Sequence, residues 1–409
     1  MIFGIHSKVW RIRMDILIVA NFCLDFSELD NGRFSYLADM LSVENEVEVI
    51  TSSFYHITKK QRIIPKEKKV YKVTYLYEPG YMKNISLKRF YSHRKWGRNV
   101  SEYIKKRKKP DVIYCAVPSL TAPYELARYC KKNNIKFIID IQDLWPEAFK
   151  LAFDIPIVSN IIFSPFKLLV DYVYRQADVI CGVSETYVNR ALKVNKKNRN
   201  GHVVFLGTQL STFDNNVINN ECDIIKSDNE IWVGYCGTLG ASYDISIVIK
   251  ALHIIKKRGI KSVKFIIMGD GEYREKFELL SETLGVDCIF TGRLPYNRMC
   301  ATLSMCDIAV NPIMHNAAQS IINKHGDYAA AGLPVINTQE NKEYRQLVKS
   351  YKMGFNVRNN DVESFADRLI YLINNEETRN KMGRNARKCA KQKFDRTNTY
   401  KELVFEIVK

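Results

Sequence analysis

The sequence predicts an α/β fold built from two doubly wound domains, each with a parallel sheet covered by helices. Short, continuous apolar runs alternate with helix-like stretches along the chain, as expected for strands buried on both faces. The alternation forms two series, separated by an Asn- and Asp-rich stretch at 211–230. A chain of 409 residues is also too long for one compact core.

We place the first domain at 14–205 and the second at 206–391. The predicted strands of the first domain are "DILIVA", "EVEVITS", "DVIYCAV", "KFIIDI" and "DVICGV". Those of the second are "IWVGYCG", "VKFIIMG", "CIFTG", "DIAVNPI" and "LPVINT". Residues 1–13 precede the first strand and are too polar for a secretory signal, so we expect no functional role for them.

Glycines and one arginine follow three strands of the second series. Gly237 and Gly240 come after the first strand, Gly269 and Gly271 after the next, and Arg293 after the third. Parallel sheets bind ligands at the carboxyl ends of their strands, where glycine admits close backbone approach and helix starts offer N–H groups to anions. Each motif alone is as consistent with a tight turn, but three in one sheet predict a shared ligand crevice.

A polar cluster leads into the Ala-rich run of "AAQSIINKHGDYAAAGLPVI", residues 317–336. It contains Gln319, Ser320, Lys324 and Asp327 and follows the fourth strand of the series. Helices that only pack do not usually begin with so many hydrogen-bonding groups. We therefore expect this helix start to point into the same crevice.

These motifs together resemble the retaining glycosyltransferases of the GT-B fold, the large family-4 group that uses nucleotide-sugars. The resemblance rests on "CGTLG", "GDGE", "TGRLP" and "NKHGDYAAAGLPVI", supported by "IIDIQDLWPE" in the first half. It implies two Rossmann-like domains facing across a cleft, with the nucleotide-sugar on the second domain. It also implies that residues 392–409 form a last helix that returns to pack on the first domain.

The donor-site residues of the family carry over unevenly. Two glutamates seven residues apart are usual, and Gln319 and Asp327 stand at the matching positions. The resemblance assigns Asp327 to the ribose and Gln319 to the donor sugar. The family's diphosphate-binding Arg and Lys are replaced here by Thr238 and Tyr243.

The missing cations leave Lys324 as the expected diphosphate ligand, because a diphosphate with no cation in a closed crevice is poorly stabilised. Arg293 and the backbone N–H groups around Gly240 and Ser320 are expected to assist. We expect Asp143, Gln319 and Lys324 to act in the reaction itself.

Two carboxylates, Asp140 and Asp143, stand at the end of a strand in "FIIDIQDLWPE". The family places a His or Asp near here, facing the acceptor and the anomeric carbon, and Asp143 fits best. The alternative is that Asp143 only caps the helix predicted after it. Asp140 is also expected on the acceptor side of the cleft, but as a buried, hydrogen-bonded residue.

Acceptor contacts are also expected from a loop after the first strand and from His56. Asn31 and Gly32 precede Arg33, and this pair of Gly and Arg opens a predicted helix suited to an acceptor phosphate. A structural role for His56 is equally consistent with its place in "SSFYHITKK".

Positive charge is concentrated in residues 59–109, with 18 Lys and Arg against 3 Asp and Glu, a net of +15 of the chain's +18. No uncharged apolar stretch reaches the ~18 residues of a membrane-spanning helix. Such a charge run most often marks a solvated face, but its density here predicts an anionic membrane surface as a partner. Interleaved aromatics fit interfacial anchoring: Tyr75, Tyr77, Tyr81, Phe90, Tyr91 and Trp96.

The resulting hypothesis is a hexosyltransferase-type enzyme that acts, with retention, on a lipid-pyrophosphate-linked saccharide in capsule or O-antigen assembly. We expect it at the cytoplasmic face of the cell membrane as a peripheral protein, with no nucleic acid partner. The absence of a D-x-D motif and of Cys or His at zinc spacing predicts metal independence and no cofactor, and the ten cysteines are expected to be reduced.

Three alternatives remain open. The same fold serves sugar-nucleotide 2-epimerases, which need no acceptor. A non-catalytic glycosyltransferase-like subunit would agree with Gln319, Thr238 and Tyr243. A nucleic-acid-binding protein would explain the basic stretch but not the glycine loops.

Overall fold

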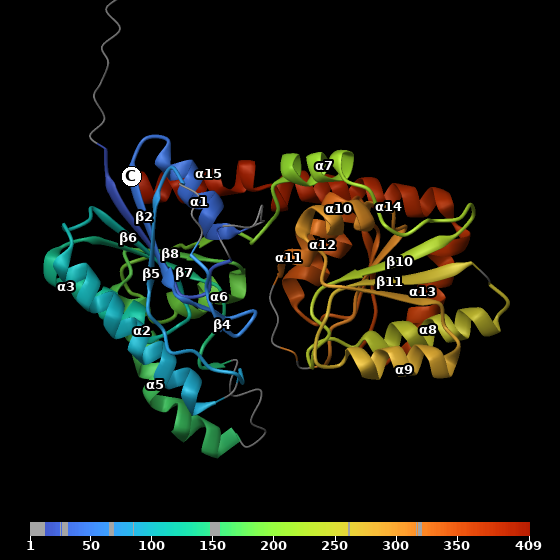
Figure 1. The fold of residues 1–409 in the computed structure, drawn as a ribbon, viewed down its shortest axis with the longest axis horizontal. Helices are drawn as coiled ribbons and strands as arrows, with labels where there is room; N and C mark the ends of the chain where they lie inside the picture. Colours follow the sequence, from blue (N-terminus) through green and yellow to red (C-terminus); the bar gives the residue numbers. More distant parts are fainter. Residues whose placement is uncertain are drawn as a thin grey trace, which may run out of the picture.

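The computed structural model describes residues 13–24, 26, 32–64, 69–84, 86–147, 156–260, 262–315, 317 and 321–409, and of 156–162 only the backbone. Two α/β units stand side by side and are joined along one edge (Figure 1). Each contains one large sheet whose strand pairs are all parallel. The predicted fold class, two doubly wound parallel-sheet domains, is confirmed.

The sheet of the first domain has the strand order β5-β2-β1-β6-β7-β8-β9. Its order reverses beside β1, which pairs with β2 on one side and β6 on the other. The strands are β1 (Asp15–Ala20), β2 (Glu46–Ser52), β5 (Lys72–Leu76), β6 (Val112–Val117), β7 (Lys136–Ile141), β8 (Val179–Gly182) and β9 (His202–Val203). A separate antiparallel hairpin consists of β3 (Phe54–Tyr55) and β4 (Lys60–Gln61).

Helices cover both faces of this sheet, because successive residues of β1 point to opposite sides. Leu17 and Val19 face a core shared with α2 (Leu87–Lys106), α3 (Thr121–Asn133), α5 (Pro156–Gln176) and α6 (Glu185–Leu192). Ile16 and Ile18 face α1 (Arg33–Ser42) and the C-terminal helix α15 (Arg396–Val408).

The long basic helix α2 is amphipathic. Ser86 caps its start by accepting from the Arg89 backbone N–H, and Trp96, Val100 and Ile104 form its buried stripe. Gly97 lets α2 approach α3 closely, since a Cβ there would lie 2.8 Å from the Ala122 backbone nitrogen. Packing on α3, rather than helix propensity alone, therefore positions the basic face of α2.

The sheet of the second domain has the order β12-β11-β10-β13-β14-β15. Its strands are β10 (Ile231–Cys236), β11 (Val263–Met268), β12 (Cys288–Gly292), β13 (Ile308–Asn311), β14 (Val335–Asn337) and β15 (Gly354–Asn356). The order reverses between β10 and β13, the usual place for a ligand crevice in such sheets. Its helices are α7 (Leu210–Asn219), α8 (Ile245–Lys257), α9 (Arg274–Leu284), α10 (Tyr296–Ser304), α11 (Asn323–Ala330), α12 (Lys342–Tyr351), α13 (Val362–Asn374) and α14 (Glu376–Cys389).

The chain crosses between the domains twice, and the two crossings are hydrogen-bonded to each other. The Thr208 N–H donates to the Phe394 carbonyl at 2.8 Å, and the Arg396 N–H donates to the Thr208 carbonyl at 3.2 Å. Gly207 has a φ of +61°, and a Cβ there would lie 2.3 Å from the Phe394 carbonyl oxygen. A π-helical turn, Ala390–Phe394, links α14 to α15, which runs back across the first domain (Figure 1).

Several aromatics of the basic stretch are core residues rather than surface anchors. Trp96 and Tyr81 are buried, whereas Tyr77 and Tyr91 are exposed. The sequence pattern did not separate the two kinds, because the buried stripe of α2 is interleaved with its basic face. Among the described residues, no helix combines the length and the apolar character needed to span a membrane.

Candidate functional site

The loops after β10 and β11 pack tightly against each other at the carboxyl end of the second sheet. The N–H groups of Gly237 and Leu239 donate to the carbonyls of Met268 and Asp270, both at 3.0 Å. A Cβ on Gly269 would lie 1.8 Å from the Gly237 carbonyl oxygen, and one on Gly271 would lie 2.4 Å from that of Leu239. Loop packing thus accounts for Gly269 and Gly271, and their predicted donor contacts stay a prediction.

Lys324 lies at the start of α11 with its side chain directed at this loop. The side chain is 7% exposed, and within the described part of the chain its Nζ has no hydrogen-bond partner. A Cβ built on Gly237, whose φ is +139°, would lie 2.8 Å from Lys324 Nζ. Glycine is favoured at 237 by this φ, and a side chain there would also displace the ammonium group.

Two tyrosine rings hold the Lys324 ammonium in place of a carboxylate. Nζ lies 4.1 Å from the ring centroid of Tyr235 and 3.9 Å from that of Tyr243. Burial lowers the pKa of Lys324 to about 7. A buried cation held only by aromatic faces keeps its hydrogen-bond donors available for an incoming anion.

Tyr243 occupies the position where the resembling family usually has a cation, and its ring lies against the ammonium of Lys324 at the start of α11. From the sequence, Tyr243 was interpreted only as the replacement of a positively charged residue. Its role as a ring beneath Lys324 needed the tertiary structure.

The start of α11 is fixed by His325. Its ring stacks on Tyr344 of α12, with centroids 3.5 Å apart and planes at 7°, and its Nδ1 accepts from the Ile322 N–H at 3.3 Å. His325 is fully buried, and burial, followed by the nearby Lys324, lowers its pKa well below the ordinary value. A neutral imidazole therefore stands beside the Lys324 ammonium.

Asp327, predicted to bind the donor ribose, is 5% exposed and already accepts two hydrogen bonds. Its Oδ1 accepts from the Thr208 hydroxyl at 2.7 Å and from the Tyr296 hydroxyl at 2.9 Å. Burial raises the pKa of Asp327, and the hydrogen bonds from these two hydroxyls reduce that increase. Thr208 lies at the crossing between the domains, a connection that the sequence did not indicate.

The remaining residues predicted at the donor site have few contacts or lie outside the described residues. Arg293 is exposed, and its side chain forms no hydrogen bond with the residues that the structure describes. The Cβ position of Gly240 is open, with only the Thr238 methyl nearby at 3.6 Å. Gln319 and Ser320 lie outside the described residues, as does Asn31 of the predicted acceptor loop.

In the first domain, the carboxylate of Asp143 is held from three sides. Its Oδ1 accepts from the Leu144 N–H at 2.9 Å and from the Tyr187 hydroxyl at 3.4 Å, and its Oδ2 accepts from the Trp145 indole at 3.1 Å. Burial raises the pKa of Asp143, and these donors oppose the shift. The group is oriented and only partly exposed, as a positioned carboxylate requires.

His56 lies in a cationic, aromatic cluster on the same domain. Its Nδ1 is 2.7 Å from the Tyr81 hydroxyl and 3.0 Å from Lys59 Nζ. The guanidinium of Arg89 lies 5.3 Å from the Tyr81 ring centroid and 4.5 Å from that of Trp145. Burial, with Lys59 and Arg89 nearby, lowers the pKa of His56 to about 3, and burial lowers that of Lys59 to about 8.

Asp140 is buried and hydrogen-bonded, as predicted, but its partner is Arg33, which was expected at the acceptor. Arg33 Nε donates to Asp140 Oδ2 at 2.7 Å, and both side chains are buried. Arg33 also donates to the carbonyls of Val204 and Phe205 and to the Tyr400 hydroxyl. The pair is thus assigned to the domain interior and not to the acceptor, and Gly32 serves as the N-cap residue of α1.

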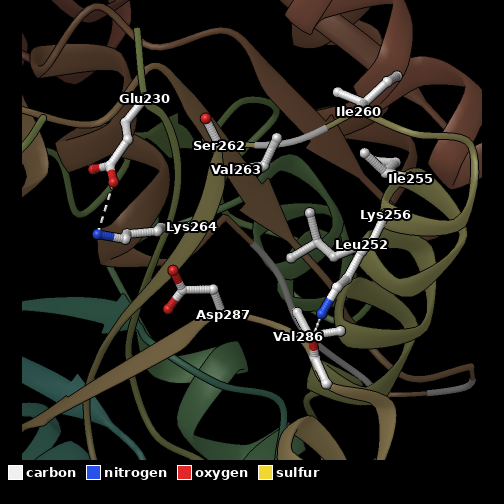
Figure 2. Close-up of a pocket in the computed structure, with 11 residues that line it drawn as sticks. Glu230, Leu252, Ile255, Lys256, Ile260, Ser262, Val263, Lys264, Val286 and Asp287 are labelled. Carbon is white, nitrogen blue, oxygen red and sulfur yellow. Dashed lines mark hydrogen bonds and ion pairs between the residues drawn. The ribbon is translucent and has the colours of Figure 1, made fainter. Parts of the chain in front are cut away.

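A pocket of about 180 Å³ lies at the opposite end of the second sheet (Figure 2). Glu230, Val263 and Asp287 line it at the amino ends of the strands, and Lys264 and Glu230 form an ion pair at 2.7 Å. It is smaller than usual ligand pockets and lies at the wrong strand ends. Among the described residues, no group of three or more His, Cys, Asp or Glu could hold a metal ion.

Residues 218–389 match the family described as "Glycosyl transferases group 1". This part of the second domain is therefore similar to group 1 glycosyltransferase domains. The match spans β10 to α14, including Lys324, Asp327 and the glycine loops. The predicted resemblance is therefore confirmed for this domain.

Comparisons that cover more of the chain also find glycosyltransferases. The capsular polysaccharide biosynthesis glycosyltransferase CapM of Staphylococcus aureus is 25% identical over 258 residues, which cover 58% of this chain and 64% of CapM. WaaG, a glycosyltransferase involved in lipopolysaccharide biosynthesis, aligns with a TM-score of 0.67 at 14% identity, over 96% of this chain and 99% of WaaG. Anabaena HepE in complex with UDP aligns with a TM-score of 0.69 at 16% identity, over the same shares. These solved structures show that both domains together have the GT-B fold.

Proposed function

We propose that this protein transfers a sugar from a nucleoside diphosphate donor to a hydroxyl of a saccharide acceptor, with retention of anomeric configuration. The observation that carries the proposal is the buried Lys324 ammonium, held by two rings and aimed at the glycine loop of a group 1 domain. A cation in that state is unfavourable without an anion, and a diphosphate supplies one. Structures of the GT-B protein HepE contain UDP and UDP-glucose, which supports a nucleotide-sugar as the donor.

Charge stabilisation is the main demand of this chemistry. As the glycosidic bond breaks, the sugar becomes oxocarbenium-like and the departing diphosphate gains negative charge. Lys324 would stabilise the diphosphate, Gln319 would contact the sugar and Asp327 the ribose hydroxyls. For the ribose to bind, its hydroxyls would replace the Thr208 or Tyr296 hydroxyl as hydrogen-bond donors to the Asp327 carboxylate.

Asp143 would orient the acceptor or stabilise the positive charge on the sugar. Its carboxylate is fixed by the Trp145 indole and the Tyr187 hydroxyl. In a retaining transfer the departing phosphate would receive the proton of the acceptor hydroxyl on the same face. Asp143 would then need only to keep its position and charge.

The acceptor we propose is a lipid-pyrophosphate-linked saccharide in cell-surface polysaccharide biosynthesis. CapM and WaaG serve capsular polysaccharide and lipopolysaccharide biosynthesis, respectively. Lys59 and Arg89, which approach the Tyr81 ring near Asp143, would meet anionic groups of the acceptor. The protein would work at the cytoplasmic face of the cell membrane.

The donor test comes first. The purified protein is mixed with a panel of nucleotide-sugars and its Tm is measured, since a ligand at 100 times its Kd adds about 2.7 kcal/mol of stability. The protein is then incubated with the radiolabelled form of the stabilising donor and with a lipid extract that contains the acceptor. The reaction is run with and without EDTA. We expect lipid-linked radiolabelled sugar in both cases, because metal independence is part of the proposal.

Two results would contradict this function. Release of free sugar nucleotide epimer without acceptor would identify a 2-epimerase. No stabilisation by any nucleotide-sugar would favour a non-catalytic subunit.

Membrane binding is predicted to depend on the start of α2 and the loop before it. Met82, Leu87 and Tyr91 are exposed there, next to the exposed Lys83 and Lys88. Each lysine near an anionic surface contributes about 1 kcal/mol, so losing two lowers partitioning about 10- to 30-fold. We expect the wild type to co-sediment with phosphatidylglycerol vesicles at low salt and the Lys83→Ala/Lys88→Ala variant to do so weakly.

The matched control replaces Lys391 and Lys393, an exposed pair in the π-helical turn that links α14 to α15. That variant should co-sediment like the wild type, and binding of both should fall at high salt. Wild-type protein that ignores these vesicles at low salt would remove the membrane from the proposal.

A further inference from the structure

The two domains touch through a carboxylate of the second domain that caps a helix of the first. Glu343, in the first turn of α12, accepts from the backbone N–H groups of Glu185 at 3.0 Å and Thr186 at 2.8 Å. Its Oε1 also accepts from the Thr186 hydroxyl at 2.9 Å. Both acceptor oxygens of one residue thus hold the start of α6 across the domain boundary.

This contact completes the capping of α6. The first N–H groups of a helix have no intrahelical partner, and a carboxylate near them is favoured by the helix dipole. The Ser184 hydroxyl, at the N-cap, accepts from the Tyr187 N–H at 3.3 Å, and the Ser184 carbonyl accepts from the Val188 N–H at 3.1 Å. Glu343 therefore supplies from the other domain what the α6 sequence does not supply itself.

Helix α6 carries a hydrogen-bond donor to Asp143, the candidate carboxylate on the acceptor side. The residue after Thr186 is Tyr187, whose hydroxyl donates to Asp143 Oδ1 at 3.4 Å. Arg190, one turn later, anchors α6 to the first domain by ion pairs to Glu147 and Asp171, both at 2.6 Å. A shift of the α6 start would thus move the Tyr187 donor relative to Asp143.

The same turn of α12 also leads to the donor side. Tyr344, next to Glu343, stacks on His325, and His325 adjoins Lys324. Two neighbouring residues of α12 therefore reach both sides. Tyr344 contacts His325, which adjoins Lys324, and Glu343 contacts the start of α6, which carries the Tyr187 donor to Asp143. This arrangement joins two groups that the proposed reaction needs at once.

We propose that Glu343 is a positioning residue, which couples closure of the two domains to the orientation of Asp143 through the start of α6. This inference rests on the proposed function for its kinetic consequence only. The contact itself and its effect on Asp143 can be measured without any sugar transfer.

The first readout is hydrogen–deuterium exchange at the Glu185 and Thr186 amides. In the wild type both should be protected, and in Glu343→Ala they should exchange at least about 10-fold faster, because no intrahelical acceptor replaces the lost one. The control is Glu363→Ala: Glu363 also lies in the first turn of a helix of the second domain, but its ion pair, to Arg258, stays within that domain. It should leave both amides protected.

The second readout follows Asp143 through the indole of Trp145, which donates to its Oδ2 at 3.1 Å. The chain has 4 tryptophans, so their indole ¹⁵N–¹H signals can be resolved and Trp145 assigned with a Trp145→Phe sample. We expect the Trp145 signal to shift in Glu343→Ala and not in Glu363→Ala. An unchanged signal would overturn the coupling to Asp143.

The kinetic readout compares Glu343→Ala with Glu343→Gln and Tyr187→Phe. We expect kcat to fall about 10-fold in Glu343→Ala with the donor KM unchanged, because misplaced groups raise the barrier rather than weaken donor binding. Glu343→Gln, which keeps one acceptor oxygen, should recover part of the loss. Tyr187→Phe should add little to Glu343→Ala, since both act on the same connection.

Each remaining outcome has a distinct meaning. Unprotected Glu185 and Thr186 amides in the wild type would overturn the contact. Equal kcat values for Glu343→Ala and Glu363→Ala would overturn its role in the reaction. A wild type that transfers no sugar would count against the proposed function, while the exchange and indole readouts would still decide whether Glu343 positions Asp143.

Discussion

Replacing Lys324 by methionine is expected to lower kcat/KM for sugar transfer about 100- to 1,000-fold, the usual effect of removing one group that stabilises developing charge. The same change should raise the stability of the ligand-free protein. Methionine fills a similar volume, and it removes a buried ammonium group that lacks a hydrogen-bond partner among the described residues. Loss of activity with a gain of stability distinguishes a binding group from a structural one.

The gain in stability should depend on pH in a defined direction. The folded-state pKa of Lys324 is about 7, against 10.5 for an exposed lysine. Between these values the unfolded chain holds a proton that the folded chain lacks, so wild-type stability rises with pH across this window. The shift sets an upper limit of about 5 kcal/mol, of which the two ring contacts offset part.

Thermal unfolding of the wild type and Lys324→Met from pH 6 to pH 10 checks this expectation. The Tm difference should be a few degrees in favour of the variant below pH 7 and should shrink toward pH 10. Lys250→Met, an exposed position on α8 of the same domain, is the control and should show no such trend. A Lys324→Met protein stabilised by the donor as strongly as the wild type would refute the diphosphate assignment.

Asp140→Asn is expected to destabilise the protein by about 3–5 kcal/mol, because it leaves the buried Arg33 guanidinium without its countercharge. Arg33 also holds the carbonyls of Val204 and Phe205, next to the first crossing, and the Tyr400 hydroxyl of α15. Urea unfolding, followed by circular dichroism, measures the loss.

The control for this prediction is Asp367→Asn. Asp367 pairs with Arg258 at 2.7 Å, but both side chains are largely exposed, so the change should leave the urea midpoint nearly unchanged. The double variant Arg33→Met/Asp140→Leu should be more stable than Asp140→Asn, since it removes both charges together. Activity lost by Asp140→Asn at full stability would instead return Asp140 to the acceptor site.

The alternation of apolar runs was enough to predict both sheets. Each strand of a doubly wound sheet is buried on both faces, so it appears in the sequence as a continuous apolar segment such as "DILIVA" or "KFIIDI". The position of the candidate donor loops followed from the same pattern, because parallel strands present their carboxyl ends together. The predicted domain limits near 205 and 391 stay predictions.

Contacts between distant residues were outside the reach of the pattern. Arg33 and Asp140 each follow a signal typical of a binding site, yet they are 107 positions apart and neutralise each other in the core. Likewise, Trp96 and Tyr81 carry the same sequence signal as the exposed Tyr91 but are buried. Pairing across the fold, not residue type, decides which polar or aromatic groups remain available.

What the sequence alone determined is the fold class, the family resemblance and the choice of Lys324, because these depend on local periodicity and on motifs within one loop. What only the tertiary structure decided is the state of that lysine, the burial of the Arg33–Asp140 pair and the contact of Glu343 with α6. The ammonium of Lys324 is held by the ring of Tyr243, 81 positions away, and that of Tyr235, 89 positions away. Such contacts depend on how helices and loops pack across the sheets, which no local pattern encodes.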